Sequence, residues 1–181
     1  MKFYFYTFLT ALFVYSCENS NTSQRDYAYF GGEIINPSNN YITLSNALEG
    51  KDTIYLDINN RFLYKIDSLI PGMYSFTHGG EYQSILLEPN DSLLFRLNTN
   101  DFDESLVYTG LGSKKNNYLI KSFLDDEIEN KEFMNTSHLE PEVFVEHMKK
   151  LRKQKLVHFD EFLSNKPSSD LFETIVRSSI C

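Results

Sequence analysis

The chain has 181 residues, of which 41% are hydrophobic, and it carries 25 acidic and 17 basic side chains, for a formal net charge of −8. Its 15 Phe and 12 Tyr residues can fill a core, which excludes a disordered chain, and its acidic balance excludes nucleic acid as a partner, because that affinity needs clustered Lys and Arg. Cys17 and Cys181 are its two cysteines, so these residues can form neither a CxxC redox pair nor a disulfide framework.

The first sixteen residues have the pattern of a secretory signal peptide. Lys2 supplies a positive charge, and an uncharged run follows from 3 to 15, which is too short for a membrane span of about 20 residues. The run ends on VYSC, which is similar to the lipobox of bacterial lipoproteins. This resemblance implies cleavage before Cys17 and a lipid on its thiol, hence a lipoprotein held on a membrane of the bacterial cell envelope, facing the periplasm or the cell surface. The alternative is an ordinary signal peptide with a chance cysteine.

Residues 17–26 are predicted to form a lipidated polar tether, and residues 27–112 a β-sandwich domain. The tether contains no apolar residue to bury after Cys17. Beyond it, short runs of β-branched and aromatic residues alternate with Gly, Pro, Asn and Asp, which is typical of strands joined by turns. The expected strands lie at 28–35, 41–46, 52–58, 61–66, 73–77, 82–88, 91–97 and 105–109. About eight strands with no helix between them favour an antiparallel sandwich.

Two turns and two alternating runs refine the predicted sandwich. Asn59 and Asn60 suit a two-residue hairpin, and the sequence 89–91 indicates a second tight reversal. Alternation predicts one buried face for each of two strands. The residues expected on these faces are Ile54, Leu56 and Ile58 in one strand and Leu93, Phe95 and Leu97 in the other.

Residues 113–181 are predicted to form a helical connector region. Apolar residues recur with helical spacing over 114–129 and 141–165, and a third helix begins with Asp170 as N-cap and Glu173 in the capping-box position. The fold class is therefore mainly β with C-terminal α. The third helix reaches Cys181 without a glycine cap or a polar tail, so we expect a chain truncated within this connector. Charge also divides here, with 4 basic and 11 acidic groups in 27–112 and 11 and 12 in 113–181.

No residue pattern predicts a metal site or a cofactor. The four histidines are His78, His138, His147 and His158, and none has the spacing of a paired metal ligand. Acidic clusters at 101–104 and 125–127 lack the spacing of a calcium-binding loop. The GLG sequence at 110–112 is a weak phosphate motif and fits a junction between strand and helix better. Sugar stacking would depend on sheet tyrosines, namely Tyr41, Tyr55, Tyr74, Tyr82 and Tyr108.

The lipobox and four other segments together resemble a known family. These are GGEIINP at 31–37, GMYSF at 72–76, LLEPNDSL at 86–93 and GLGSKKNNY at 110–118, and with the lipobox they are similar to the N-terminal region of TlpA-like thiol-disulfide oxidoreductase lipoproteins. In that family a β-sandwich and a helical connector precede a thioredoxin-like domain whose CxxC performs the redox reaction. This chain contains neither the thioredoxin-like domain nor the CxxC, so no catalytic residue can be assigned from the resemblance.

Two functions remain open on this basis. The first is a non-catalytic accessory region of a membrane-anchored thiol-disulfide oxidoreductase, positioning a missing thioredoxin-like domain or its substrates. The alternative is a stand-alone envelope lipoprotein whose sandwich binds a glycan, a peptide or a partner protein. An enzyme that acts through an unrecognised carboxylate site is a distant third. Cys17, as the lipidation site, is the one site residue that the sequence assigns.

Overall fold

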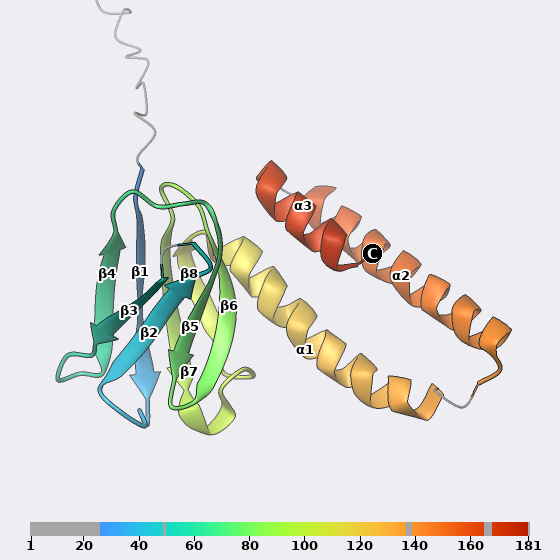
Figure 1. The fold of residues 1–181 in the computed structure, drawn as a ribbon, viewed down its shortest axis with the longest axis horizontal. Helices are drawn as coiled ribbons and strands as arrows, with labels where there is room; N and C mark the ends of the chain where they lie inside the picture. The colour runs from blue at the N-terminus through green and yellow to red at the C-terminus, as the bar shows by residue number, and fades with distance from the viewer. Residues whose placement is uncertain (1–25, 49, 137–138, 165–167, 181) are drawn as a thin grey trace, which may run out of the picture.

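The computed structural model describes residues 26–48, 50–136, 139–164 and 168–180, with the side chains of 132–136 left out. Cys17, Cys181 and His138 lie outside the described residues, as do the predicted signal peptide and nearly all of the predicted tether. The described chain forms eight strands followed by three helices (Figure 1), which confirms the predicted fold class.

The strands form two four-stranded sheets. They are β1 Ala28–Ile35, β2 Tyr41–Asn46, β3 Gly50–Tyr55, β4 Arg61–Ile66, β5 Gly72–His78, β6 Glu81–Leu87, β7 Ser92–Asn98 and β8 Val107–Leu111, with a 3-10 turn at Thr99–Asp101. One sheet has the order β4-β1-β7-β8 and the other β3-β2-β5-β6. Neighbouring strands are antiparallel except β1 and β7, which run parallel in the centre of their sheet.

The connection between β3 and β4 differs from the predicted hairpin. Asn60 has the expected positive φ, at 59°, but β3 pairs with β2 whereas β4 pairs with β1 in the other sheet. The Asp57 Oδ1 atom accepts hydrogen bonds from the backbone N–H groups of Asn59 and Arg61, which closes the turn where the chain changes sheets. β3 therefore ends at Tyr55, and Ile58 is 98% exposed rather than buried.

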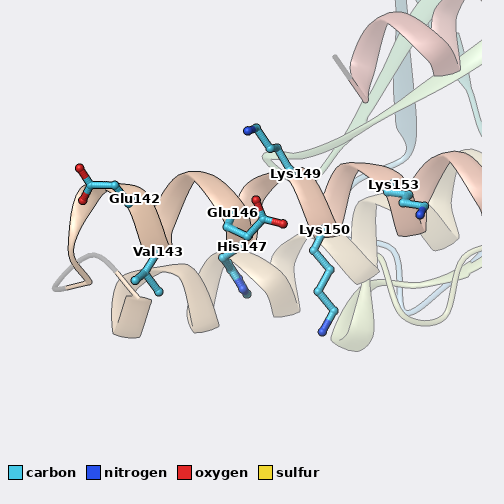
Figure 2. Close-up of a pocket in the computed structure, with 7 residues that line it drawn as sticks. All are labelled: Glu142, Val143, Glu146, His147, Lys149, Lys150 and Lys153. Atoms are coloured by element: carbon cyan, nitrogen blue, oxygen red, sulfur yellow. The ribbon is translucent and has the colours of Figure 1, made fainter.

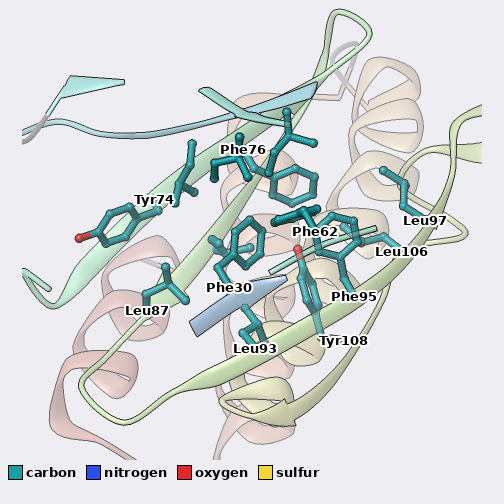
Figure 3. Close-up of a cluster of buried hydrophobic side chains, with 14 of the residues drawn as sticks. Phe30, Phe62, Tyr74, Phe76, Leu87, Leu93, Phe95, Leu97, Leu106 and Tyr108 are labelled. Carbon is teal, nitrogen blue, oxygen red and sulfur yellow. The ribbon is translucent and has the colours of Figure 1, made fainter. Parts of the chain in front are cut away.

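A hydrophobic core fills the space between the two sheets (Figure 3). Phe30 and Phe95 from the first sheet contact Phe76 from the second, and the rings of Phe76 and Phe95 stack with centroids 5.0 Å apart. Leu93, Phe95 and Leu97 are buried as their alternation predicted. Aromatic pairs of this kind add about 0.5–1.5 kcal/mol each beyond the area they bury.

Three helices follow the sandwich and lie on one side of it (Figure 1). They are α1 Ser113–Thr136, α2 Pro141–Ser164 and α3 Asp170–Ser179. Ile120 of α1 is buried in the sandwich core. Leu86 of β6 belongs instead to a second core, which it forms with Phe159 of α2 and with Phe172 and Val176 of α3. The helices are thus attached through both faces of α1 and through the outer side of β6.

Helix boundaries depart from the predicted ones at two places. α1 extends to Thr136, seven residues beyond the predicted end at 129. The N-cap of α3 is Ser169 rather than Asp170, because the Ser169 hydroxyl accepts the hydrogen bond from the backbone N–H of Phe172. A serine hydroxyl and an aspartate carboxylate both suit this position, so the residue types alone did not separate two adjacent candidates.

Candidate functional site

The candidate site is the junction where β8 leads into α1, which contains the GLG sequence at 110–112. Gly110 and Gly112 have φ values of 83° and 88°, a region that side chains disfavour. A Cβ at Gly110 would collide with the Ser92 carbonyl oxygen, and one at Gly112 would lie 2.6 Å from Asp91 Oδ1. Both glycines are therefore required for the chain to pass from strand to helix against β7. This explains them without a bound phosphate.

A lysine and two carboxylates form the charged centre of the junction. Lys115 Nζ on α1 lies 2.6 Å from Glu88 Oε2 and 2.6 Å from Asp91 Oδ2, and all three side chains are largely buried. Glu88 Oε2 also accepts a hydrogen bond of 2.8 Å from the Ser169 hydroxyl, the N-cap of α3. One lysine thus connects the β6–β7 turn to α1, and Glu88 extends that connection to α3.

Burial has a larger effect on the pKa of Asp91 than the positive charge of Lys115 has. Desolvation raises the pKa of Asp91 above its ordinary value, while the attraction and hydrogen bond of Lys115 act in the opposite direction. Asp91 Oδ2 also accepts the backbone N–H of Glu88 at 2.8 Å, which holds the reversal at 89–91 in the predicted position. Removal of Lys115 would leave two largely buried carboxylates without their positive partner, which is strongly destabilising even where the intact contact adds little net stability.

Two consecutive asparagines of α1 bond to the edge strands of both sheets. Asn116 accepts a hydrogen bond from Leu86 N at 2.8 Å and donates one to Leu86 O at 2.9 Å. Asn117 repeats the pattern with Tyr108 of β8, at 2.9 and 2.8 Å. Each amide side chain occupies the place that a neighbouring strand would take. α1 thereby covers the edges of β6 and β8 and fixes the helical region on the sandwich.

Sequence reasoning missed Lys115, Asn116 and Asn117 as functional residues, although it included them in a family-like segment. A signal was available, because asparagine is a weak helix former and two in succession near a helix start indicate side chains with another task. Which strands they would bind depends on the sheet order. The sequence did not contain a local marker for that order.

A cavity of about 360 Å³ lies beside this junction. Its lining includes Leu111, Lys114, Phe162, Ser168 and Phe172. The starts of α1 and α3 both border it, an arrangement that favours anions, but Asp91 lies against the start of α1 and Glu88 against the N-cap of α3. The protein's own carboxylates therefore occupy the positions that an external anion would need.

The other residues singled out in the sequence are spread over the fold. His78 is buried, with Nε2 accepting a hydrogen bond from Ser38 N and Nδ1 lying 2.9 Å from the Tyr41 carbonyl oxygen, so both ring nitrogens have structural partners. Asp103 accepts a hydrogen bond from Gln83, and Asp126 pairs with Lys155. Within the described residues, no three His, Cys, Asp or Glu side chains are grouped closely enough to hold a metal ion.

The candidate sugar-stacking tyrosines divide into two groups. Tyr74 and Tyr108 are 4% and 2% exposed in the core, so neither can stack on a ligand. Tyr41, Tyr55 and Tyr82 are exposed on the sheet of β2, β3 and β6, where the rings of Tyr41 and Tyr55 contact each other edge to face. The structure therefore excludes two of the five tyrosines from this role.

Two further hollows lie at the surface, one on α2 and one on a sheet. One lies along the surface of α2 alone (Figure 2) and is lined by seven residues of that helix, four of them between 142 and 147. The other is a broad depression over the outer face of the β4-β1-β7-β8 sheet, where the side chains of Leu63 and Leu94 lie over Gly31. None of the described helices has an apolar stretch long enough to cross a membrane.

Comparison of the chain with protein-family models, with curated proteins and with solved structures finds no match. The similarity to TlpA-like lipoproteins accordingly depends on the sequence segments alone.

Proposed function

We propose that the chain is a non-catalytic accessory module of a membrane-anchored thiol-disulfide oxidoreductase of the bacterial envelope, and that it positions a thioredoxin-like domain or its substrates. The observation that carries this proposal is the junction at α1. Asn116 and Asn117 bond to one edge strand of each sheet, and Lys115 bonds to the β6–β7 turn. A helical region held in this way keeps one orientation on the sandwich, which a positioning module requires.

The proposal assigns no redox step to the described residues. Dithiol exchange needs an attacking thiolate and a resolving cysteine, and in a lipoprotein the thiol of Cys17 carries lipid. The buried carboxylates of Glu88 and Asp91 are engaged with Lys115 and with backbone or hydroxyl donors. Their role is therefore attachment of the helices.

The lipid anchor is tested by replacing Cys17 with Ala in the full chain. We expect the wild-type protein in the membrane pellet after a salt wash and the variant in the soluble fraction, because Cys17 would carry the membrane attachment. Immunoblots of both fractions provide the measurement, and Ser20→Ala, in the predicted tether and outside the lipobox, serves as a control that retains the cysteine. A Cys17→Ala variant that stays in the pellet would contradict the anchor.

The redox assignment is tested separately by reading the DNA that follows codon 181. A thioredoxin-like segment with a CxxC within a few hundred codons, in any forward frame, supports the accessory function. Intergenic sequence or an unrelated gene there favours the stand-alone binding lipoprotein. The two tests are independent, because either function is compatible with a lipid on Cys17.

A further inference from the structure

The two long helices, α1 and α2, are covered by α3 along only part of their length. Near the sandwich, Phe172 of α3 contacts Phe159 of α2 and Tyr118 of α1. α3 ends at Ser179, and a groove of about 450 Å³ continues from Ile180 along α2, with Glu129 of α1 on its border. Val145 and Met148 line this groove and are 48% and 39% exposed. This outer part thus exposes apolar side chains that another helix would cover in a bundle.

The charges beside this groove are arranged along α2 in two blocks. Glu142 and Glu146 lie toward the Pro141 end, and Lys149 and Lys153 follow toward the sandwich (Figure 2). At about 100° per residue, these four side chains fall within an arc of about 60° on the helix, next to Val145. The helix therefore carries an acidic segment and a basic segment on the same flank.

This charge pattern is complementary to itself when the helix is reversed. In an antiparallel pair of α2 helices, the alignment that places Glu142 opposite Lys153 of the partner subunit also places Glu146 opposite the partner's Lys149. Two-fold symmetry repeats both pairs. A parallel two-fold pair would place the two charged flanks on opposite sides of the seam, where these charges do not meet. In the antiparallel alignment, the N-terminal end of the partner's α2 lies near the end of α3. The partner's α2 and α3 therefore cover different parts of the groove.

We propose that the groove binds α2 of a second copy of this chain, so that two α1–α2 arms form an antiparallel four-helix bundle. Val145 and Met148 of both copies make the apolar seam, and the glutamate–lysine pairs on its flank set the antiparallel orientation. In a lipidated protein, this dimer would attach to the membrane through two lipid groups and so dissociate from it more slowly than a monomer.

Zero-length carbodiimide crosslinking of the full chain provides the decisive measurement. Glu142 and Lys153 of one helix are eleven residues apart, about 16 Å along the axis, so a crosslink between them forms only between two copies. We expect a Glu142–Lys153 crosslink by mass spectrometry. In an equal mixture of ¹⁴N- and ¹⁵N-labelled protein, half of these crosslinks should join one light and one heavy peptide.

Charge reversal tests the same interface in solution by sedimentation velocity. Glu142→Lys with Glu146→Lys, and Lys149→Glu with Lys153→Glu, should each weaken the dimer at least tenfold, because every pair becomes repulsive. Mixing the two variants should restore a dimer, which also shows that both are folded. Lys51→Glu with Glu81→Lys, a matched pair of reversals on the sandwich, should leave the dimer unchanged.

Three results would overturn the proposal. They are a monomer at all concentrations up to about 200 µM, a dimer whose crosslinks join other surfaces, and no heterodimer when the two folded charge-reversed variants are mixed. None of these results bears on the proposed accessory function, which does not require two copies.

Discussion

Tyr108 places a hydroxyl group in the sandwich core without a hydrogen-bond partner among the described residues. Burial, together with the negative charge of Asp103, raises its pKa well above the ordinary value for tyrosine. We expect Tyr108→Phe to raise the free energy of unfolding by about 1 kcal/mol, because it removes an unpaired polar group and keeps the ring. Urea unfolding followed by circular dichroism measures the change.

Tyr74→Phe is the matched control for that prediction. Tyr74 is also buried, but its hydroxyl donates a hydrogen bond of 3.0 Å to the Ile70 carbonyl oxygen. Its removal should lower the free energy of unfolding by about 1 kcal/mol. If both variants lose the same stability, the hydroxyl of Tyr108 has a partner in solution, and a bound water is the simplest candidate.

The contribution of Asp103 to stability should depend on pH with a sign opposite to that of an ordinary paired carboxylate. Desolvation raises its pKa, the hydrogen bond from Gln83 lowers it, and the charges of Glu104, Glu127 and Glu81 raise it further. A raised folded-state pKa means that the folded protein binds this proton more tightly than the unfolded chain. The contribution of Asp103 to stability is therefore highest at low pH and decreases as the pH rises from its unfolded-state pKa through its folded-state pKa.

Asp103→Asn isolates that contribution. The amide keeps an oxygen for Gln83 and removes the charge, so at pH 7 the variant should melt at a higher temperature than the wild type. The difference should decrease as the pH falls through the folded-state pKa and should be nearly lost at about pH 3, where the carboxyl of the wild type is mostly protonated in both states. Melting curves between pH 3 and pH 7 test this. A variant that is less stable at pH 7 would show that the charged carboxylate has a stabilising role.

The attachment of α1 to the sandwich can be tested at its two consecutive asparagines. Asn116→Ala leaves the buried N–H and carbonyl of Leu86 without partners, so the free energy of unfolding should fall by about 2–4 kcal/mol. Asn117→Ala should act in the same direction at Tyr108. Asn130→Ala, at an exposed position of the same helix, should change stability little. Equal losses at all three positions would mean that helix propensity, rather than edge bonding, determines the result.

Local patterns predicted most strands, whereas the pairing between strands required information from distant residues. The alternation of Leu93, Phe95 and Leu97 identified a strand and its buried face, because burial on one side leaves a period of two in the sequence. The turn at Asn60 was also visible, since asparagine tolerates positive φ. That its two flanking strands belong to different sheets is decided by their partners in β1 and β2, far along the chain.

The candidate site shows the same limit. The GLG sequence marked the strand-to-helix junction and the 89–91 reversal lay in a family-like segment, but nothing local indicated that Lys115 would bridge Glu88 and Asp91. A lysine 24 residues beyond Asp91 in the sequence becomes its neighbour only after the sheets have formed. Residues that connect two parts of a fold therefore show their role in three dimensions rather than in the sequence.

The division into sandwich and helices predicts how fragments behave. Sequence reasoning expects 27–112 to fold alone, since sheets bury their faces against each other. All buried members of the sandwich core except Ile120 belong to that span, but the edges of β6 and β8 lose Asn116 and Asn117. We expect 27–112 to melt cooperatively and 27–136, which restores α1, to melt at a higher temperature. If the fragment 27–112 is unfolded while 27–136 is folded, the sandwich needs α1 in order to fold.

The central position of β1 determines how the domain would respond to mechanical force. The chain enters the sandwich through this strand, which is paired along its length with β4 on one side and β7 on the other. A pull on residue 27 along the strand therefore loads both ladders in shear, so that many hydrogen bonds share the force, whereas an edge strand peeled sideways would lose them one at a time. If the proposed lipid on Cys17 anchors the chain, a force on that anchor would act first on a strand held by neighbours on both sides.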